Sequence, residues 1–114
     1  QGLRYFIERI HNEYNKKIPI YITENGMANK DFLDKKNEII DEDRIEYFNL
    51  HLKEVLKCLH KGIPIKGYFA WSLMDNYEWS LGYEKRFGVV YVDYQSFKRI
   101  PKKSYYEFQK NLCV

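Results

Sequence analysis

The sequence predicts an alternating α/β fold, and three observations support this prediction. Amphipathic helical repeats alternate with short apolar runs that are rich in β-branched and aromatic residues, which is the pattern of helices joined to buried parallel strands. A long polar segment follows each apolar run, as expected for loops at strand ends. No internal repeat or low-complexity stretch interrupts this order.

The first helix is predicted over residues 3–14 and ends near residues 15–17, where two lysines place positive charge at its C-terminus. Its apolar residues recur at helical spacing and are Leu3, Phe6, Ile7, Ile10 and Tyr14. After a short connection, a strand is predicted through Ile18–Thr23. The polar and irregular segment Gly26–Ile40 then predicts a long loop.

A second helix is predicted to begin at Asp41 or Asp43 and to end at Lys61. The glycine that follows, Gly62, suits the left-handed position after a helix. The apolar stripe of this helix is formed by Ile45, Phe48, Leu52, Val55, Leu56 and Leu59.

The next strand is predicted over Ile63–Trp71, and a second long loop follows over Leu73–Arg86. The segment Phe87–Tyr94 is rich in strand-forming residues and predicts an excursion before the last helix. Pro101 is expected at the first position of that helix. Its inward-facing residues are expected to be Tyr105, Tyr106, Phe108 and Leu112.

Composition excludes several functional classes. The 114 residues suit one small domain. The net charge of +3 comes from scattered lysines, so there is no basic stripe for nucleic acid. No run of about 18 apolar residues predicts a membrane span. Cys58 and Cys113 are far apart, so we expect reduced thiols and no metal site, and the lack of a disulfide pattern favours a cytoplasmic location.

Glu24 is the residue that most strongly indicates function. It follows an apolar run within the segment Ile22-Thr23-Glu24-Asn25-Gly26. Ionised carboxylates are rarely buried without a partner, and active sites of parallel α/β barrels lie at the carboxyl ends of strands. A solvated glutamate that begins a turn is the simpler alternative.

A second segment extends this interpretation, namely GYFAWSLMDNYEW at residues 67–79, followed by Gly82-Tyr83 and Arg86-Phe87-Gly88. Together with the first segment, it resembles the C-terminal part of glycoside hydrolase family 1, from Gly2 to the last helix. The resemblance implies the last two βα units of a (β/α)8 TIM barrel. A complete barrel needs roughly 250 residues, so we expect residues 1–114 to be the C-terminal portion of a single barrel domain. The missing N-terminal part would then be its structural partner.

The resemblance gives Glu24 a chemical role. Retaining glycosidases use two carboxyl groups about 5–5.5 Å apart, and the glutamate of the family's Thr-Glu-Asn-Gly motif is the nucleophile. The acid/base carboxylate of the family lies in an Asn-Glu-Pro motif on an earlier strand, and this motif does not occur here. We therefore expect that this chain alone does not hydrolyse glycosides.

The resemblance also implies a sugar-binding set. Trp71 corresponds to a platform under the sugar, while Glu78 and Trp79 correspond to the residues that hold the hydroxyls at positions 4 and 6. Phe87 lines the glycone end in many relatives, although packing is an equal alternative, and Trp71 could be a core aromatic. The family also has a cis peptide bond after the platform tryptophan, here Trp71–Ser72.

Glu78 predicts an unphosphorylated substrate, because a carboxylate repels the phosphate of phospho-glycosides. We therefore expect β-D-glucosides and β-D-galactosides as substrates, and the resemblance calls for no cofactor. Two alternatives remain open. The chain could belong to a catalytically silent relative that binds glycosides or a protein, or it could be a barrel fragment that acts as an assembly module.

Overall fold

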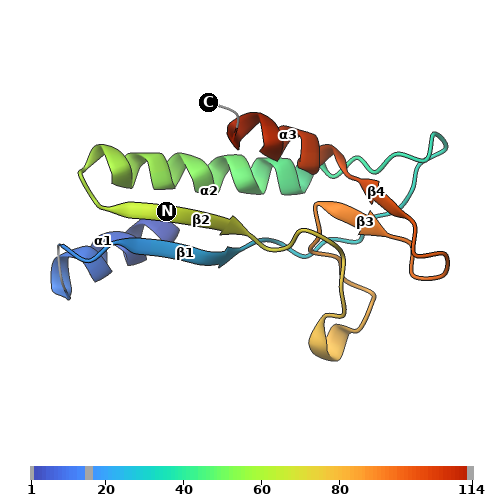
Figure 1. The fold of residues 1–114 in the computed structure, drawn as a ribbon, viewed down its shortest axis with the longest axis horizontal. Coiled ribbons are helices and arrows are strands. Elements are labelled where there is room, and N and C mark those ends of the chain that lie inside the picture. The colour runs from blue at the N-terminus through green and yellow to red at the C-terminus, as the bar shows by residue number, and fades with distance from the viewer. Residues whose placement is uncertain (1, 15–16, 113–114) are drawn as a thin grey trace.

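Helices and strands alternate along the chain, as predicted from the sequence. The structure is a computed structural model that describes residues 2–14 and 17–112. Its elements are α1 (Gly2–Glu13), β1 (Ile20–Asn25), α2 (Glu42–His60), β2 (Ile65–Ala70), a short 3-10 helix (Trp79–Leu81), β3 (Val90–Val92), β4 (Arg99–Pro101) and α3 (Lys103–Leu112). Figure 1 shows α2 running alongside β2, with α3 beside α2.

The sheet has one covered face and one open face. β1 and β2 pair in parallel, and α1 and α2 supply the side chains that pack against them. The buried core consists of Ile7, Ile22, Val55, Cys58, Ile63 and Ile65. On the opposite face, Tyr21 and Phe69 remain more than half exposed. A two-stranded sheet that is covered on one side only is typical of a part of a larger parallel sheet.

A second, antiparallel pair of strands comes before the last helix. β3 pairs with β4, with Tyr91 opposite Ile100. α3 then packs on α2, where the rings of Phe48 and Phe108 lie 5.3 Å apart. This arrangement agrees with the excursion predicted between the second loop and the last helix.

The bounds predicted for several elements are wrong. β2 runs from Ile65 to Ala70, not from Ile63 to Trp71. β1 begins at Ile20 and continues to Asn25, because its pairing with β2 persists as far as the partner of Asn25, Ala70. Pro101 lies in β4 rather than at the start of α3. It lies in an edge strand of a two-stranded sheet, a position that tolerates a residue without an N–H.

The predicted apolar stripes are wider than the surface that the fold covers. α1 buries Ile7 but leaves Phe6 and Ile10 exposed, and α3 leaves Tyr106 and Leu112 exposed. Helical spacing identifies residues that share a face, whereas their burial depends on the neighbouring elements. The predicted helix end at residues 15–16 and Cys113 lie outside the described residues.

None of the helices within residues 2–14 and 17–112 combines the length and the apolar character that a membrane span requires.

Candidate active site

A β-bulge determines where the side chain of Glu24 points. Ile22 is paired with Tyr68, and Asn25 is paired with Ala70, so β1 has one more residue than β2 in this stretch. Strict alternation would place Glu24 on the same covered face as Ile22. Because of the extra residue, both residues between Ile22 and Asn25 are exposed. Bulges frequently re-orient a side chain in this way, and from the exposure of Glu24 and the shifted register we infer that its side chain faces the open side of the sheet. It lies within the strand, not after it as expected.

The side chain of Asn25 lies on the covered face again, and both its amide nitrogen and its amide oxygen are hydrogen-bonded. Its Nδ2 donates to Tyr47 Oη of α2 at 3.2 Å, and Tyr68 Oη of β2 donates to its Oδ1 at 2.6 Å. Its main-chain oxygen accepts a hydrogen bond from the Trp71 N–H at 2.8 Å. Burial raises the pKa of Tyr68, and the neighbouring Tyr47 adds to the shift. Tyr68 is therefore a neutral hydrogen-bond donor at physiological pH.

Trp71 follows β2 and lies beside the segment that follows β1. A Cβ atom on Gly26 would come within 1.8 Å of the main-chain oxygen of Trp71, so only glycine allows the two segments to approach this closely. The Trp71–Ser72 peptide bond is cis, as the resemblance led us to expect. Ser72 N–H donates to the main-chain oxygen of Phe87 at 3.1 Å. The structure thus brings Glu24, Trp71 and Phe87 to the same end of the sheet.

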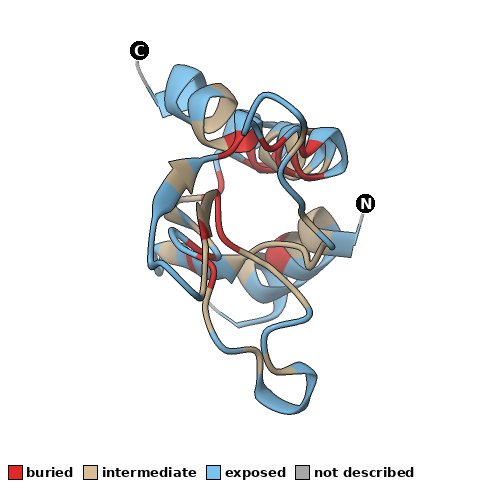
Figure 2. Ribbon diagram, turned by 90° about the vertical axis from the view of Figure 1, so that its right-hand side faces the viewer, coloured by how far each residue is buried: buried red, intermediate tan, exposed pale blue. Residues whose placement is uncertain are grey.

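The segment between β2 and β3 forms a loop that projects from this end of the sheet (Figure 1), and this segment contains Glu78 and Trp79. Glu78 N–H donates to the main-chain oxygen of Gly82 at 2.8 Å, which closes the tip of the loop. Trp79 begins the 3-10 helix with a positive φ of 42° and is 82% exposed. In Figure 2 the projecting loop carries no buried residues. The described residues therefore do not enclose this pair in a pocket with Glu24.

A buried network of charged side chains connects both loops to α2 and α3. It contains three carboxylates and three cations, namely Asp31, Asp41, Asp75, Arg44, Arg86 and Lys102. Apart from Arg86, these side chains are 1% exposed or less. This network was not predicted from the sequence. The available signals were the i,i+3 spacing of Asp41 and Arg44 at a helix start and the charge of Lys102 just before the last helix.

Lys102 joins the loop after β1 to the loop after β2. Its Nζ donates to Asp31 Oδ2 at 2.5 Å and to Asp75 Oδ1 at 2.7 Å. Arg44 Nη2 donates to the same Asp31 oxygen at 2.7 Å, and Arg44 also pairs with Asp41. Burial lowers the pKa of Lys102, and the charge of Arg44 lowers it further. Burial acts to lower the pKa of Arg44 as well, but the hydrogen bonds and negative charges of Asp31 and Asp41 outweigh this effect, and the pKa of Arg44 is raised.

Asp75 fixes both ends of the second loop. Its carboxylate accepts hydrogen bonds from Arg86 Nη1 at 2.7 Å, from the Gly88 N–H at 3.0 Å and from the Val92 N–H at 3.3 Å. The guanidinium of Arg86 also lies 4.1 Å from the centre of the Tyr91 ring, within the range of a cation–π contact. Hydrogen-bonded buried networks make a segment rigid, and Asp75 is bonded to Lys102, Arg86, Gly88 and Val92, so the base of the loop is held firmly while its tip projects. Within the network, Arg44 Nε is buried without a hydrogen-bond partner.

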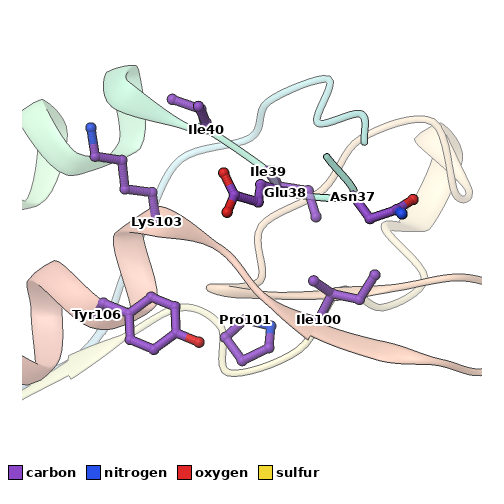
Figure 3. Close-up of a pocket in the computed structure, with 8 residues that line it drawn as sticks. All are labelled: Asn37, Glu38, Ile39, Ile40, Ile100, Pro101, Lys103 and Tyr106. Carbon is purple, nitrogen blue, oxygen red and sulfur yellow. The ribbon is translucent and has the colours of Figure 1, made fainter. Parts of the chain in front are cut away.

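The hollow shown in Figure 3 lies away from the predicted site residues. It has a volume of about 420 Å³ and is lined by Asn37, Glu38, Ile39, Ile40, Ile100, Pro101, Lys103 and Tyr106. A second hollow of about 340 Å³ lies between β2 and α3, where Tyr68, Phe69 and Phe108 contribute to its walls. Within the described residues, no group of three or more histidine, cysteine, aspartate or glutamate side chains could hold a metal ion.

Comparison with known proteins places the chain among glycosidases. The model of Glycosyl hydrolase family 1 matches residues 1–112. Beta-glucosidase A of Thermotoga maritima is 45% identical over 106 residues, which are 93% of this chain and 24% of that protein. A 6-phospho-beta-galactosidase of Clostridium acetobutylicum is 48% identical over 110 residues, which are 96% of this chain and 23% of that protein.

The solved structures lead to the same group. The structure of the beta-glucosidase from Thermotoga maritima in complex with castanospermine matches with a TM-score of 0.94 and 43% identity. The match covers 97% of this chain and 25% of that chain. The chain therefore spans about a quarter of the length of the relatives that it matches.

Proposed function

The chain belongs to glycosyl hydrolase family 1, and on that premise we propose that the protein carrying it is a retaining β-glycosidase with Glu24 as the nucleophile. Its described residues form the last two βα units of a (β/α)8 barrel and do not close the sheet. We assign residues 1–114 to the C-terminal portion of a single barrel domain.

The position of Glu24 is the observation that carries the proposal. Its side chain is exposed near the carboxyl end of β1, where active sites of parallel barrels lie, and we infer that its carboxylate faces the open side of the sheet. There the carboxylate attacks the anomeric carbon and forms a glycosyl ester, while a second carboxyl group protonates the leaving oxygen. Water activated by the second group then cleaves the ester. No Asn-Glu-Pro motif is present to supply that group, so the 114-residue chain by itself is proposed to be inactive.

The sugar would be held by the residues that follow β2. Trp71 is 39% exposed, so part of its ring system is free to stack on the apolar face of a pyranose. Trp79 is 82% exposed and would help Glu78 to hold the hydroxyls at positions 4 and 6. Glu78 would accept hydrogen bonds from two adjacent hydroxyls, which are stronger because the acceptor is charged. Phe87, whose main chain is bound to Ser72, would line the glycone end.

Glu78 also decides our choice between two kinds of substrate. The relatives include proteins named beta-glucosidase and proteins named 6-phospho-beta-galactosidase at similar identity, so overall similarity does not separate them. A carboxylate at the end of the sugar that would carry the phosphate repels a phosphorylated substrate. We therefore propose unphosphorylated β-D-glucosides and β-D-galactosides.

The test is a set of initial rates for the protein expressed from its complete reading frame. Nitrophenyl β-glucoside, nitrophenyl β-galactoside and its 6-phosphate are the substrates, and Glu24→Gln is the variant. We expect the two unphosphorylated substrates to give the higher kcat/KM values and Glu24→Gln to abolish turnover. A preference for the 6-phosphate would overturn the substrate assignment, whereas binding of glycosides without turnover would identify a catalytically silent relative.

The open face of the sheet supports an assembly role for the chain. Tyr21 and Phe69 are 56% and 57% exposed there, and Gly67 lies beneath both rings. We propose that the rest of the barrel covers this face, because unpaired strand edges and exposed apolar side chains favour association. The isolated 114-residue chain should then oligomerise or stay partly unfolded. A monodisperse monomer with a cooperative thermal transition, measured by light scattering and calorimetry, would contradict this.

A further inference from the structure

We propose that Asn25 is a positioning residue for Glu24, held between the hydroxyl groups of Tyr47 and Tyr68 so that the bulge in β1 keeps the carboxylate on the open face. This proposal rests on the proposed function, because it explains how Glu24 is oriented for its role as the nucleophile. Asn25 itself does not touch the reacting atoms.

The need for such a residue follows from the bulge. No residue of β2 is paired with Thr23 or Glu24, so the ladder alone does not hold these two residues. They are fixed by their neighbours, with Ile22 in the buried core on one side and Asn25 on the other. Among the described residues, the carboxylate of Glu24 makes no hydrogen bond or ion pair. Its direction therefore depends on the backbone that Asn25 holds.

The two partners of Asn25 require an amide side chain. Tyr68 donates to the amide oxygen, and the amide nitrogen donates to Tyr47, so a hydrocarbon side chain would leave both hydroxyls without this partner. Burial raises the pKa of Tyr68, which keeps its proton available for the hydrogen bond. Neither partner lies on a mobile loop, since Tyr47 belongs to α2 and Tyr68 to β2.

Tyr47 is itself fixed by aromatic contacts. Its ring stacks on His51 with centroids 3.9 Å apart and meets Phe48 edge-on at 5.9 Å. Phe48 is part of the buried interior. The packed helix α2 therefore fixes Tyr47, and Tyr47 fixes the side chain of Asn25 at the end of β1. Functional groups are held precisely when packed neighbours fix the residues that support them.

The experiment uses the protein expressed from its complete reading frame and the variants Asn25→Ala, Tyr47→Phe and Tyr68→Phe. Asn49→Ala on the exposed side of α2 and Tyr106→Phe on α3 are matched controls. Glu24 is labelled with a dinitrophenyl 2-deoxy-2-fluoro-β-glucoside. In this step a carboxylate oxygen bonds to the anomeric carbon as dinitrophenolate leaves. KM for nitrophenyl β-glucoside and hydrogen exchange of the Trp71 amide are measured in parallel.

We expect Asn25→Ala to slow labelling by about 100-fold, the effect of a displacement of about 1 Å, with KM nearly unchanged. Each phenylalanine variant removes one hydrogen bond and should slow labelling by about 5- to 10-fold. The Trp71 amide should exchange faster in Asn25→Ala, since its acceptor is the main-chain oxygen of Asn25. Both control variants should match the wild type. Labelling of Asn25→Ala at the wild-type rate would overturn the proposal.

Two further results keep the proposal separate from the proposed function. If the wild-type protein neither hydrolyses glycosides nor is labelled, the proposed function fails. Hydrogen exchange of the Trp71 amide then tests the positioning role by itself. Faster exchange in Asn25→Ala supports that role, and unchanged exchange overturns it. If Asn25→Ala does not fold, Tyr68→Phe takes its place, because it removes a single oxygen atom. A fall in labelling rate that is matched by a proportional rise in KM would overturn the positioning role.

Discussion

The substitution Lys102→Met tests whether the buried charge network holds the two loops together. The ammonium of Lys102 is fully buried and binds Asp31 at 2.5 Å and Asp75 at 2.7 Å. Methionine keeps the length of the side chain but removes its charge, so the net charge of the six-membered network changes from 0 to −1. The loss leaves two carboxylates buried with one cation fewer.

The size of the effect follows from the partners that remain. Removing one member of a buried ion pair costs about 3–5 kcal/mol. Asp31 keeps its contact with Arg44, and Asp75 keeps its contact with Arg86. We therefore expect the lower end of this range, a loss of about 3 kcal/mol in the free energy of unfolding. Such a loss is a large part of the stability of an ordinary domain.

The assay is urea unfolding of the protein from its complete reading frame, followed by tryptophan fluorescence at constant m-value. Lys103→Met is the control, because this neighbouring lysine makes only an exposed pair with Glu42, and its loss should leave the unfolding free energy unchanged. Adding Asp31→Asn to Lys102→Met leaves the charges of the network balanced and should recover part of the stability. A Lys102→Met variant as stable as the wild type, or a further loss of stability when Asp31→Asn is added, would contradict this role of the network.

Three further predictions concern single residues. Gly26→Ala should cost about 1–3 kcal/mol in unfolding free energy by urea titration, because its Cβ would meet the main-chain oxygen of Trp71; wild-type stability would contradict the close approach. The pKa of Tyr68 is raised above its ordinary value of 10.0, so stability should fall as pH rises above 10. In alkaline thermal melts, a Tyr68→Phe variant should lose less stability than the wild type. An identical loss of stability would contradict the raised pKa. Lys61 lowers the pKa of Glu8 below 4.5 through a hydrogen bond of 2.6 Å, so stability should fall as pH drops below 4.5. Glu8→Gln should flatten that acid limb, and an unchanged slope would count against the pair.

The position of Glu24 near the end of a strand could be predicted from the sequence, but the face of the sheet on which its side chain lies could not. The apolar run before it and the resemblance of its motif placed it at the carboxyl end of a strand. Strict alternation would have placed its side chain with Ile22 on the covered face. The extra residue that reverses this depends on pairing with Ala70, which is 45 positions further along the chain than Asn25. A single sequence does not contain the register of two distant strands.

The buried charge network could not be predicted from the sequence for a similar reason. Asp31 and Lys102 are 71 positions apart and Asp75 and Lys102 are 27 apart, and each looks like an ordinary loop charge in the sequence. Pro101 shows the opposite error, because a strong local preference for a helix start was overruled by pairing with Val90. Local patterns therefore predicted the order of the elements, while long-range pairing determined the details of the site.

The location of the covalent intermediate tests directly whether Glu24 is the nucleophile. The protein from its complete reading frame is incubated with the 2-deoxy-2-fluoro-β-glucoside, digested and examined by mass spectrometry. We predict one fluoroglucosyl group, attached to the peptide that contains Glu24 and absent from the Glu24→Gln variant. Attachment to a different carboxylate, or rapid turnover of β-glucosides by Glu24→Gln, would contradict the assignment of Glu24 as the nucleophile.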